Sequence, residues 1–199
     1  MYKPTPIALF TLGGVVLCWM VFAAVFLFRR RLPKQPEAKR DRLSLLGIFL
    51  QMFAYFLVWF QVPGSPFLPP VAALSGSTGI VFSVCTVALA VGSVWLIASA
   101  ASTLGRHWAL AARLIEGHKL VTAGPYRFLR NPIYTGMLGM LIATGLAMEH
   151  WAALIVAVVL FAVGMVIRVR SEEKLLRSAF GKEFEDYAKR VPAVLPGIF

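Results

Sequence analysis

Residues 6–31 read PIALFTLGGVVLCWMVFAAVFLFRRR, an unbroken apolar run that ends in three consecutive arginines. A helix needs roughly 20 mainly apolar residues to cross the hydrocarbon core of a bilayer, and this run is long enough. Because it ends in Arg29-Arg30-Arg31 and not in a small-residue cleavage site, we expect a retained membrane anchor and not a cleaved signal peptide.

Four further apolar runs follow the first, and together they predict five transmembrane helices. The expected spans are 6–28, 43–62, 78–101, 133–148 and 151–167. The first three meet the length requirement of a spanning helix. The last two are shorter and predict a short helical hairpin, since only two residues separate them. The expected fold is therefore all-α and integral to the membrane, a single membrane domain over 1–199 with three N-terminal spans in 1–101.

The distribution of positive charge predicts the orientation in the membrane. All of the 20 Lys and Arg residues except Lys3 fall into three blocks, 29–42, 106–130 and 168–190. Short basic loops stay on the cytoplasmic side, and the connectors that alternate with these blocks contain no Lys or Arg. We therefore expect the N-terminus outside and the polar C-terminal segment inside, in a multi-pass protein of the bacterial inner membrane.

The composition fits a membrane protein better than a nucleic-acid-binding one. Hydrophobic residues make up 59% of the chain, the formal net charge is +11 and the mean hydropathy is +0.75. The basic residues flank the apolar runs, where they orient helices and contact anionic lipid headgroups, so no nucleic-acid partner is expected. Cys18 and Cys85 lie inside apolar runs, without the spacing of a metal site or a disulfide framework.

The first informative polar segment, EGHKLVTAGPYRFLRNPIYTG at residues 116–136, leads into the fourth apolar run. Pro132 suits the first turn of a helix, which puts Asn131 at the N-cap, although its side chain is equally able to face a ligand. Backbone N–H groups at a helix start can bind a carboxylate. The alternative interpretation is an ordered surface loop with Tyr126 and Tyr134 at the level of the headgroups.

Small residues follow at helical spacing within the fourth run. Gly136, Gly139 and Ala143 lie three and four residues apart, so they share one face of the predicted helix. Small residues let neighbouring helices approach closely in lipid. This face is therefore expected to be a helix–helix contact.

The second informative polar segment follows the fifth apolar run and begins RVRSEEKLLRSAF. If the helix continues, Arg168 and Glu172 share one face because they are four residues apart, and Glu173 points about 100° away. Ionisable groups at membrane depth are costly and often functional. The alternative is an ion pair between Arg168 and Glu172 on an interfacial amphipathic helix.

Together the two polar segments resemble a known family. GHKLVTAGPYRFLRNPIYTG is followed, about 30 residues later, by R-x-x-x-E-E-x-x-L-x-x-x-F-G-x-x-F-x-x-Y-x-x-x-V-P. This combination is similar to the isoprenylcysteine carboxyl methyltransferases, which belong with the phospholipid N-methyltransferases. The resemblance covers residues 104–197, whereas the first three spans match only in hydrophobicity and number. It implies a membrane enzyme that uses S-adenosyl-L-methionine, with its catalytic half in 102–199.

The resemblance also implies roles for individual residues. Arg168 matches the arginine that contacts the substrate, so it is expected to orient the methyl acceptor. Asn131 stands where the eukaryotic carboxyl methyltransferases commonly have His. The positions that match the cofactor-binding residues of the family are His118, Lys119, Leu120, Val121, Tyr126, Asn131, Pro132, Ile133, Tyr134 and Glu172.

The expected reaction is methylation of the carboxylate of an isoprenylcysteine-like or other lipidic acceptor. A carboxylate is ionised at neutral pH and needs a cation to orient it, which the planar guanidinium of Arg168 offers. No G-x-G-x-x-G motif is present, so the cofactor pocket is expected between the 116–135 loop and the C-terminal helical segment. The alternatives are methylation of a phospholipid amine, methylation of a small thiol, or a scaffold role without catalysis. The oligomeric state stays open.

Overall fold

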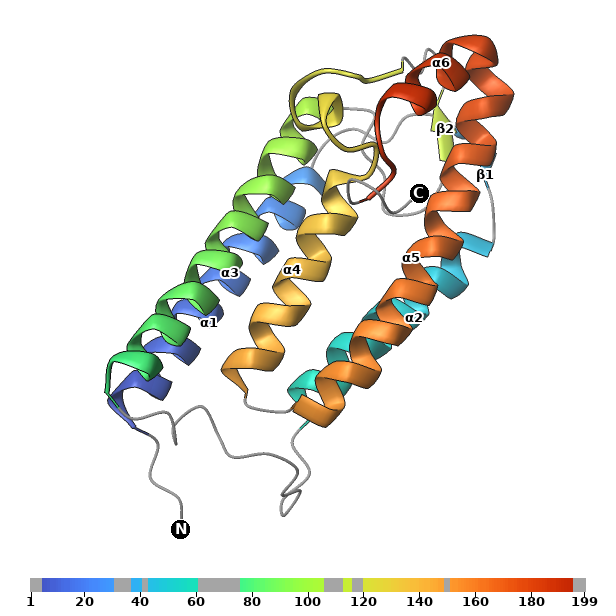
Figure 1. Ribbon diagram of the computed structural model, residues 1–199. Coiled ribbons are helices and arrows are strands. Elements are labelled where there is room, and N and C mark those ends of the chain that lie inside the picture. Colours follow the sequence, from blue (N-terminus) through green and yellow to red (C-terminus); the bar gives the residue numbers. More distant parts are fainter. Residues whose placement is uncertain are drawn as a thin grey trace.

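The computed structural model of the 199-residue chain describes residues 5–30, 37–40, 43–60, 76–105, 113–115, 120–148 and 151–194. Within this part, five long helices run along one another and alternate in direction (Figure 1). They are α1 Pro6–Arg30, α2 Leu43–Trp59, α3 Ser77–Leu104, α4 Pro132–Ala147 and α5 Trp151–Phe180.

The shorter elements gather at one end of the bundle, the upper end in Figure 1. They are the 3-10 helix η3 Gly124–Arg127, helix α6 Lys182–Arg190, strand β1 Glu37–Arg40 and strand β2 Arg113–Ile115. Each of them lies within one of the three basic blocks of the sequence. The polar part of the described chain is therefore concentrated at this end.

The strand pair departs from the all-α expectation. Strands β1 and β2 pair antiparallel, with Glu37 opposite Ile115 and Arg40 opposite Arg113. The pairing joins the connector before α2 to the connector after α3. Neither segment has the alternating apolar pattern by which a strand is recognised in a sequence, so the sequence did not predict this pairing of two connectors.

Three of the helices, α1, α3 and α5, are long and apolar enough to cross a membrane. Helices α2 and α4 are also apolar but shorter, with 17 and 16 residues. Helix α5 passes Ile167 without a break and ends at Phe180, which confirms the predicted continuation of the fifth run into the polar segment. The lengths and compositions are compatible with an integral membrane protein.

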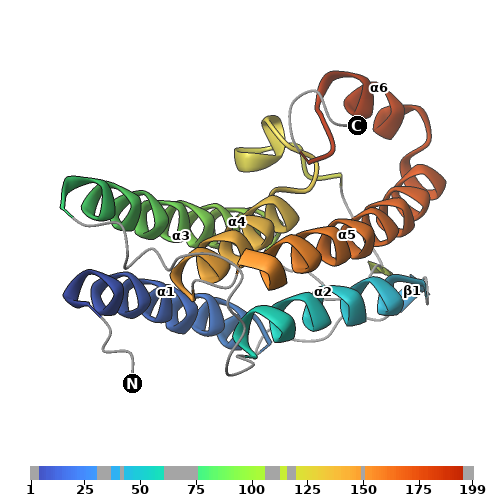
Figure 2. The same cartoon turned by 60° about the horizontal axis from the view of Figure 1, so that its bottom comes forward.

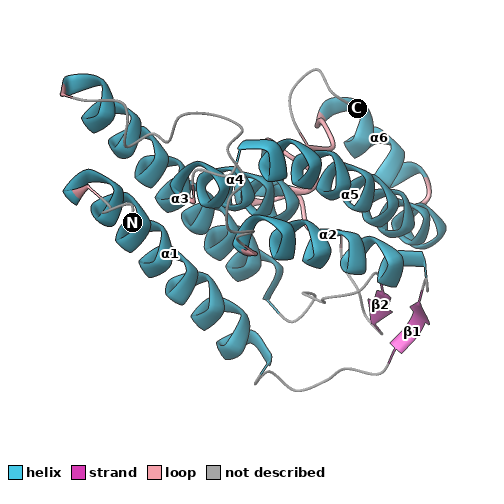
Figure 3. Cartoon of the chain, turned by 90° about the horizontal axis from the view of Figure 1, so that it is seen from below, coloured by secondary structure: helices cyan, strands magenta, loops and turns pink. Residues whose placement is uncertain are grey.

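Helix α4 lies at the centre of the bundle. Figure 2 shows α1 and α2 on one side of the bundle and α3, α4 and α5 on the other. Helix α4 contacts each of the other four long helices, and the view from below in Figure 3 shows it among them. Its position explains why most of its residues are buried, among them Tyr134, Met140 and Leu141. The first turn of α4 is therefore fixed by several neighbours at once.

Helices α3 and α4 pack through the predicted face of small residues. Gly136, Gly139 and Ala143 are all buried. A Cβ atom at Gly136 would lie 2.8 Å from the carbonyl oxygen of Ser93 and 2.6 Å from Cγ1 of Ile97. At such distances only glycine fits without a shift of the backbone. The predicted helix contact is confirmed, and α3 is its partner.

A second close approach joins α2 to α5. A Cβ atom at Gly47 would lie 2.6 Å from the carbonyl oxygen of Gly164, and one at Gly164 would lie 2.8 Å from the carbonyl oxygen of Gly47. The two backbones are therefore in contact at this point. The Arg168 side chain runs through the space that a side chain at position 47 would fill. The contact therefore brings α2 up against the polar end of α5.

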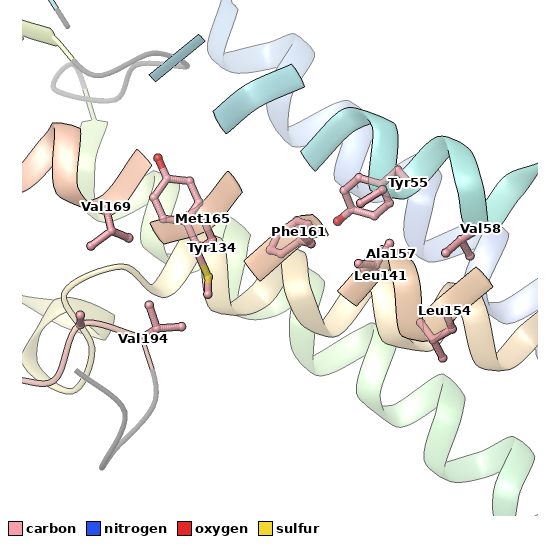
Figure 4. Close-up of a cluster of buried hydrophobic side chains, with 12 residues drawn as sticks. Tyr55, Val58, Tyr134, Leu141, Leu154, Ala157, Phe161, Met165, Val169 and Val194 are labelled. Carbon is pink, nitrogen blue, oxygen red and sulfur yellow. The ribbon is translucent and has the colours of Figure 1, made fainter. Parts of the chain in front are cut away.

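The rest of the interface between α2, α4 and α5 is mainly apolar. Figure 4 shows its side chains, including Leu141, Leu154 and Phe161. Two polar side chains in this part of the bundle have hydrogen-bond partners on a neighbouring helix. The Tyr55 hydroxyl donates to the Met137 carbonyl oxygen at 2.6 Å, and the Trp19 indole donates to Thr144 at 3.0 Å. These bonds connect helices without creating a reactive site.

Substitution of Gly164 tests the close approach of α2 and α5. In Gly164→Ala the new methyl group meets the backbone of Gly47, which cannot yield as a flexible side chain would. We expect the free energy of unfolding to fall by about 1–3 kcal/mol, the usual cost of overpacking. The midpoint of thermal unfolding of the purified protein in detergent measures this change.

Gly92→Ala is the matched control. Gly92 is also a glycine in a long apolar helix, but a Cβ atom there would meet nothing within 4 Å. Since Ala is favoured over Gly in a helix by roughly 0.5–1 kcal/mol, this variant is expected to be as stable as the wild type or slightly more so. Equal stability of the Gly164 and Gly92 variants would contradict the packing described above.

Candidate active site

The start of α4 is positioned by the C-terminal segment of the chain. Pro132 occupies the first turn of α4 and Asn131 the N-cap position, as the sequence predicts. However, the Asn131 side chain makes no capping bond. Its Nδ2 atom donates to the carbonyl oxygen of Ala193 at 3.0 Å. The N-cap position of Asn131 is therefore predicted correctly. The prediction that its side chain caps the helix is wrong, because the side-chain amide binds the C-terminal segment instead.

Backbone hydrogen bonds reinforce this attachment. The N–H groups of Arg130 and Asn131 donate to the carbonyl oxygens of Pro192 and Ala193, both at 2.9 Å. The hydroxyl of Thr135 donates to the Val194 carbonyl oxygen, also at 2.9 Å. The segment 191–194 therefore runs along the chain that leads into α4. This contact closes one side of the polar end of the bundle.

Four polar side chains from three helices meet beside this point: Gln51 of α2, Tyr134 of α4, and Arg168 and Glu172 of α5. The Tyr134 hydroxyl donates to Oε1 of Glu172. The Arg168 guanidinium lies over the Tyr134 ring, with Cζ 4.6 Å from the ring centroid. Its Nη1 atom donates to Oε1 of Gln51 at 2.8 Å, and Nη2 lies 4.0 Å from Oε1 of Glu172. We call these four residues the polar cluster.

The members of the polar cluster differ in exposure. Arg168 and Gln51 are almost fully buried, with 4% and 1% of their surfaces exposed, whereas 28% of the Glu172 side chain is exposed. A buried guanidinium needs compensating partners, and here a carboxylate, an amide oxygen and an aromatic face provide them. The cluster therefore combines a partly exposed acidic side chain, Glu172, with a buried cation, Arg168.

A second ion-pair site lies next to the polar cluster and involves the neighbouring acid. Nη2 of Arg130 lies 2.8 Å from Oε1 of Glu173, and Nε of Arg130 donates to the same oxygen at 3.0 Å. Nη1 of Arg130 donates to the carbonyl oxygens of Ala188 and Val191, at 2.7 Å and 2.5 Å. Arg130 thus joins the entry to α4, helix α5 and the end of α6. Both side chains of the pair are only 11% exposed.

The loop before α4 is held against α6 by aromatic residues. The Tyr187 hydroxyl donates to the backbone carbonyl of Tyr126 at 2.7 Å. Burial raises the pKa of Tyr187 to about 12, and Arg130 lowers and Glu173 raises that pKa more weakly. Burial also raises the pKa of Tyr126, and Glu172 raises it further. Both phenols therefore stay protonated at neutral pH and remain hydrogen-bond donors.

The structure brings together several of the residues that the sequence selects. Tyr134, Arg168 and Glu172 belong to the polar cluster, and Leu120 packs beside the α6 residues Phe184 and Tyr187. The remaining selected residues lie in the same loop or at the start of α4: Val121 and Ile133 are half-buried, and Tyr126, Asn131 and Pro132 are buried. His118 and Lys119 lie outside the described residues.

Sequence reasoning missed Gln51, Arg130 and Glu173. Gln51 carries a signal, because an amide inside an apolar run is costly unless it has a partner, but nothing in the sequence identifies that partner. Arg130 directly precedes Asn131-Pro132 and reads as one more residue of a basic block. Glu173 was recognised only as the neighbour of Glu172. No group of three or more His, Cys, Asp or Glu side chains suited to a metal ion occurs among the described residues.

Buried ionisable residues at the end of an apolar helical bundle are typical of membrane proteins with a functional polar site. Among known families, the phospholipid methyltransferases match residues 81–183, which is more than half of the chain. The chain belongs to the phospholipid methyltransferase family. The matched region contains all of α4 and α5, with Tyr134, Arg168 and Glu172, and it excludes α1 and α2.

Individual relatives differ in how much of the chain they match. The chain is 39% identical over 98 residues to the cobalt-zinc-cadmium resistance protein CzcN of Cupriavidus metallidurans, which covers 48% of the chain and 44% of that protein. It is 33% identical over 96 residues to protein-S-isoprenylcysteine O-methyltransferase B of Arabidopsis thaliana, with 47% and 49% covered. The chain thus spans about half the length of these two relatives.

A third relative is similar over nearly the whole chain. Methanethiol S-methyltransferase 2 of Bradyrhizobium diazoefficiens is 25% identical over 216 residues, which cover 94% of this chain and 76% of that protein. Together with the family match, the isoprenylcysteine O-methyltransferase relative supports the family that the two polar segments predict. The names of the two methyltransferase relatives refer to different acceptors, and that of CzcN refers to none, so the acceptor has to be argued from the site itself.

The buried pair of Arg130 and Glu173 is testable by stability. Arg130→Met removes the positive charge and leaves Glu173 with only the half-exposed Arg177, 3.2 Å away. Breaking a buried ion pair from one side costs about 3 kcal/mol, so the variant is expected to unfold well below the wild type. The double variant Arg130→Met/Glu173→Leu should recover part of this loss, as followed by thermal unfolding in detergent.

Lys189→Met is the control for loss of a surface charge. Its ion pair with Asp186 has an N–O distance of 3.7 Å, and the two side chains are 74% and 51% exposed. Exposed pairs contribute at most about 1 kcal/mol, so this variant should unfold close to the wild type. If Arg130→Met is no less stable than Lys189→Met, Arg130 does not hold the site together.

Proposed function

We propose that the chain is an S-adenosyl-L-methionine-dependent membrane methyltransferase that methylates the carboxylate of an isoprenylcysteine-like or other lipidic acceptor. The observation that carries this proposal is the polar cluster, in which the partly exposed Glu172 side chain lies beside the buried guanidinium of Arg168. The cluster lies at the end of an apolar bundle and mostly within the part of the chain that the family matches. Membrane lipids surround the bundle in this proposal.

The residues present fit a positively charged cofactor. When bound, S-adenosyl-L-methionine supplies a methyl group activated by a sulfonium, and it also carries an ammonium group. Glu172 is the acid that suits such charges, since its side chain is 28% exposed, whereas Glu173 is held by Arg130 and Arg177. Cofactor contacts are assigned to Glu172 and to the loop from His118 to Tyr134, and the product would be S-adenosyl-L-homocysteine.

The polar cluster favours an anionic acceptor. The positively charged guanidinium of Arg168 offers a planar set of donors that matches a carboxylate. A protonated amine would be repelled by the guanidinium, and the acid of the cluster, Glu172, is assigned to the cofactor in this proposal. The acceptor's lipid chain is expected to lie along the apolar surface of the helices, so it would enter from the bilayer.

A small thiol is the second candidate acceptor. The relative that matches 94% of the chain is named as a methanethiol S-methyltransferase, whereas the isoprenylcysteine O-methyltransferase relative matches 47% of it. A thiolate is also an anion, so Arg168 suits it as well. The two candidates differ in shape, because a carboxylate has two oxygen atoms to be held and a thiolate has a single sulfur atom.

Five membrane spans and a cytoplasmic active site complete the proposal. The described parts of the three basic blocks lie at the end of the bundle that carries the polar cluster, and basic loops stay in the cytoplasm. Helices α2 and α4 are about 25 Å long at 1.5 Å per residue, somewhat short of a hydrocarbon core of roughly 30 Å. Local thinning of the bilayer or flanking polar residues can accommodate that difference.

Labelling of single cysteines tests this topology. In a variant without Cys18 and Cys85, a cysteine at Ser77 is expected to react with a membrane-impermeant maleimide in intact cells. A cysteine at Ala123 is expected to react only after the cells are made permeable. Both positions are exposed, so burial does not explain a lack of reaction. Labelling at position 123 in intact cells would reject the cytoplasmic location of the site.

Two substitutions separate the proposed roles of Glu172 and Arg168. Glu172→Ala should weaken binding of S-adenosyl-L-homocysteine by about tenfold or more, because a charge-assisted contact is worth roughly 1.5–3 kcal/mol. Arg168→Lys should leave that affinity nearly unchanged and lower the rate of methyl transfer by a similar factor, since an ammonium cannot reproduce the planar fork. Calorimetry measures the binding, and a labelled methyl group measures the transfer.

The wild-type protein in the same assays decides between the function classes. A panel of a prenylated carboxylate, a thiol and a phospholipid amine shows which acceptor is methylated. A scaffold would neither bind S-adenosyl-L-homocysteine nor transfer a methyl group to any of them. Wild-type turnover by the Arg168→Lys variant would remove Arg168 from the acceptor site.

A further inference from the structure

The orientation of the Gln51 amide is fixed by its contact with Arg168. A guanidinium carries only hydrogen-bond donors, so the atom of Gln51 that lies 2.8 Å from Nη1 has to be the carbonyl oxygen, Oε1. The Nε2 atom must then point away from that nitrogen. Swapping the amide oxygen and nitrogen would place two donors against each other. The chemistry of the pair therefore settles the assignment.

The Nε2 atom of Gln51 is a buried donor with no hydrogen-bond partner among the described residues. The Gln51 side chain as a whole is 1% exposed, so bulk water does not satisfy this donor. An unsatisfied buried donor costs about 1–3 kcal/mol. Such a cost is unusual in a packed core, but it is expected where a ligand supplies the missing acceptor atom.

The surroundings hold the Gln51 amide in place. A Cβ atom at Gly164 would lie 3.2 Å from Cγ of Gln51, so the side chain lies directly on the backbone of α5. Gly47, one turn earlier in α2, leaves the space through which the Arg168 side chain runs. Because the side chains of Gln51 and Arg168 are both confined by close backbone contacts, we expect the distance and orientation between the Nε2 donor and the guanidinium to stay constant.

We propose that Gln51 belongs to the acceptor site and that its Nε2–H group donates a hydrogen bond to the acceptor's carboxylate beside Arg168. The inference rests on the proposed function, which places the acceptor at Arg168. One carboxylate oxygen would take the guanidinium and the other the amide, so that Gln51 favours a carboxylate over a thiolate. Helix α2 then determines specificity, although it lies outside the region that the family matches.

Two substitutions at Gln51 test this role in the full-length protein. Gln51→Leu keeps the approximate volume and removes both polar atoms. Gln51→Glu keeps an oxygen for Arg168 but replaces the donor by a second acceptor that repels a carboxylate. If the Leu variant does not fold, the Glu variant carries the test, since its charge is compensated by Arg168. Thermal unfolding in detergent verifies that each variant is folded.

The readout compares two acceptors, an S-prenylated N-acetylcysteine as the carboxylate and a long-chain alkyl thiol. Both Gln51 variants should raise KM for the carboxylate about tenfold to a hundredfold, the effect of one lost hydrogen bond to a charged group. For Gln51→Leu, which adds no charge, the rate with the thiol should stay within about twofold of the wild-type rate. Both variants should keep the affinity for S-adenosyl-L-homocysteine within about twofold.

Tyr55→Phe is the matched control on the same helix. It removes a buried hydroxyl one turn beyond Gln51, whose bond to the Met137 carbonyl oxygen is purely structural. This variant should leave KM for both acceptors unchanged. Equal effects of the Tyr55 and Gln51 variants would mean that only the packing of α2 matters and would overturn the inference.

The remaining outcomes separate the inference from the proposed function. If the wild type methylates the carboxylate and both Gln51 variants keep its KM, Gln51 is not in the acceptor site, while the proposed function stands. Weaker binding of S-adenosyl-L-homocysteine by the Gln51 variants would place the amide in the cofactor site and also overturn the inference. A wild type that methylates only the thiol would reject the carboxylate acceptor, and the role of Gln51 with it.

Discussion

The buried guanidinium of Arg168 is the constraint on which the polar end of the molecule depends. A charge between apolar helices is tolerated only with partners, and these come from α2, α4 and α5. The Gln51 oxygen, the Tyr134 ring and the Glu172 carboxylate surround it. Each partner requires its helix to approach closely. Gly47 of α2 and Gly164 of α5, whose backbones are in contact beside Arg168, are therefore part of the same arrangement as the charge.

Adjacent acids in one helix take different roles because a helix turns about 100° per residue. Glu172 faces Tyr134 and Arg168 and stays partly open. Glu173 faces Arg130, which also binds the end of α6. The partly exposed Glu172 is thus available to a ligand. The buried Glu173 holds the segments that Arg130 connects. A single turn of α5 combines the two tasks without any loop between them.

Helices and the spacing of residues along them could be predicted from the sequence. Contacts between residues far apart in the chain could not. The helices follow from the length of the apolar runs, and the shared face of Arg168 and Glu172 follows from their four-residue spacing on a helix that continues beyond Ile167. The partner of Gln51 lies 117 residues away and depends on a contact between two backbones. The Asn131 amide bonds to Ala193, 62 residues on, where local capping rules do not apply. The strand pair likewise joins two connectors.

Helix α5 is one uninterrupted rod of 30 residues, about 45 Å long at 1.5 Å per residue. The first half of α5 is apolar, and the second half carries Arg168 and Glu172. Because the rod has no hinge, a change in the tilt of the apolar half displaces both charges relative to Tyr134 of α4. Hydrophobic thickness of the bilayer influences helix tilt, so we expect the spacing within the polar cluster to respond to the thickness of the membrane.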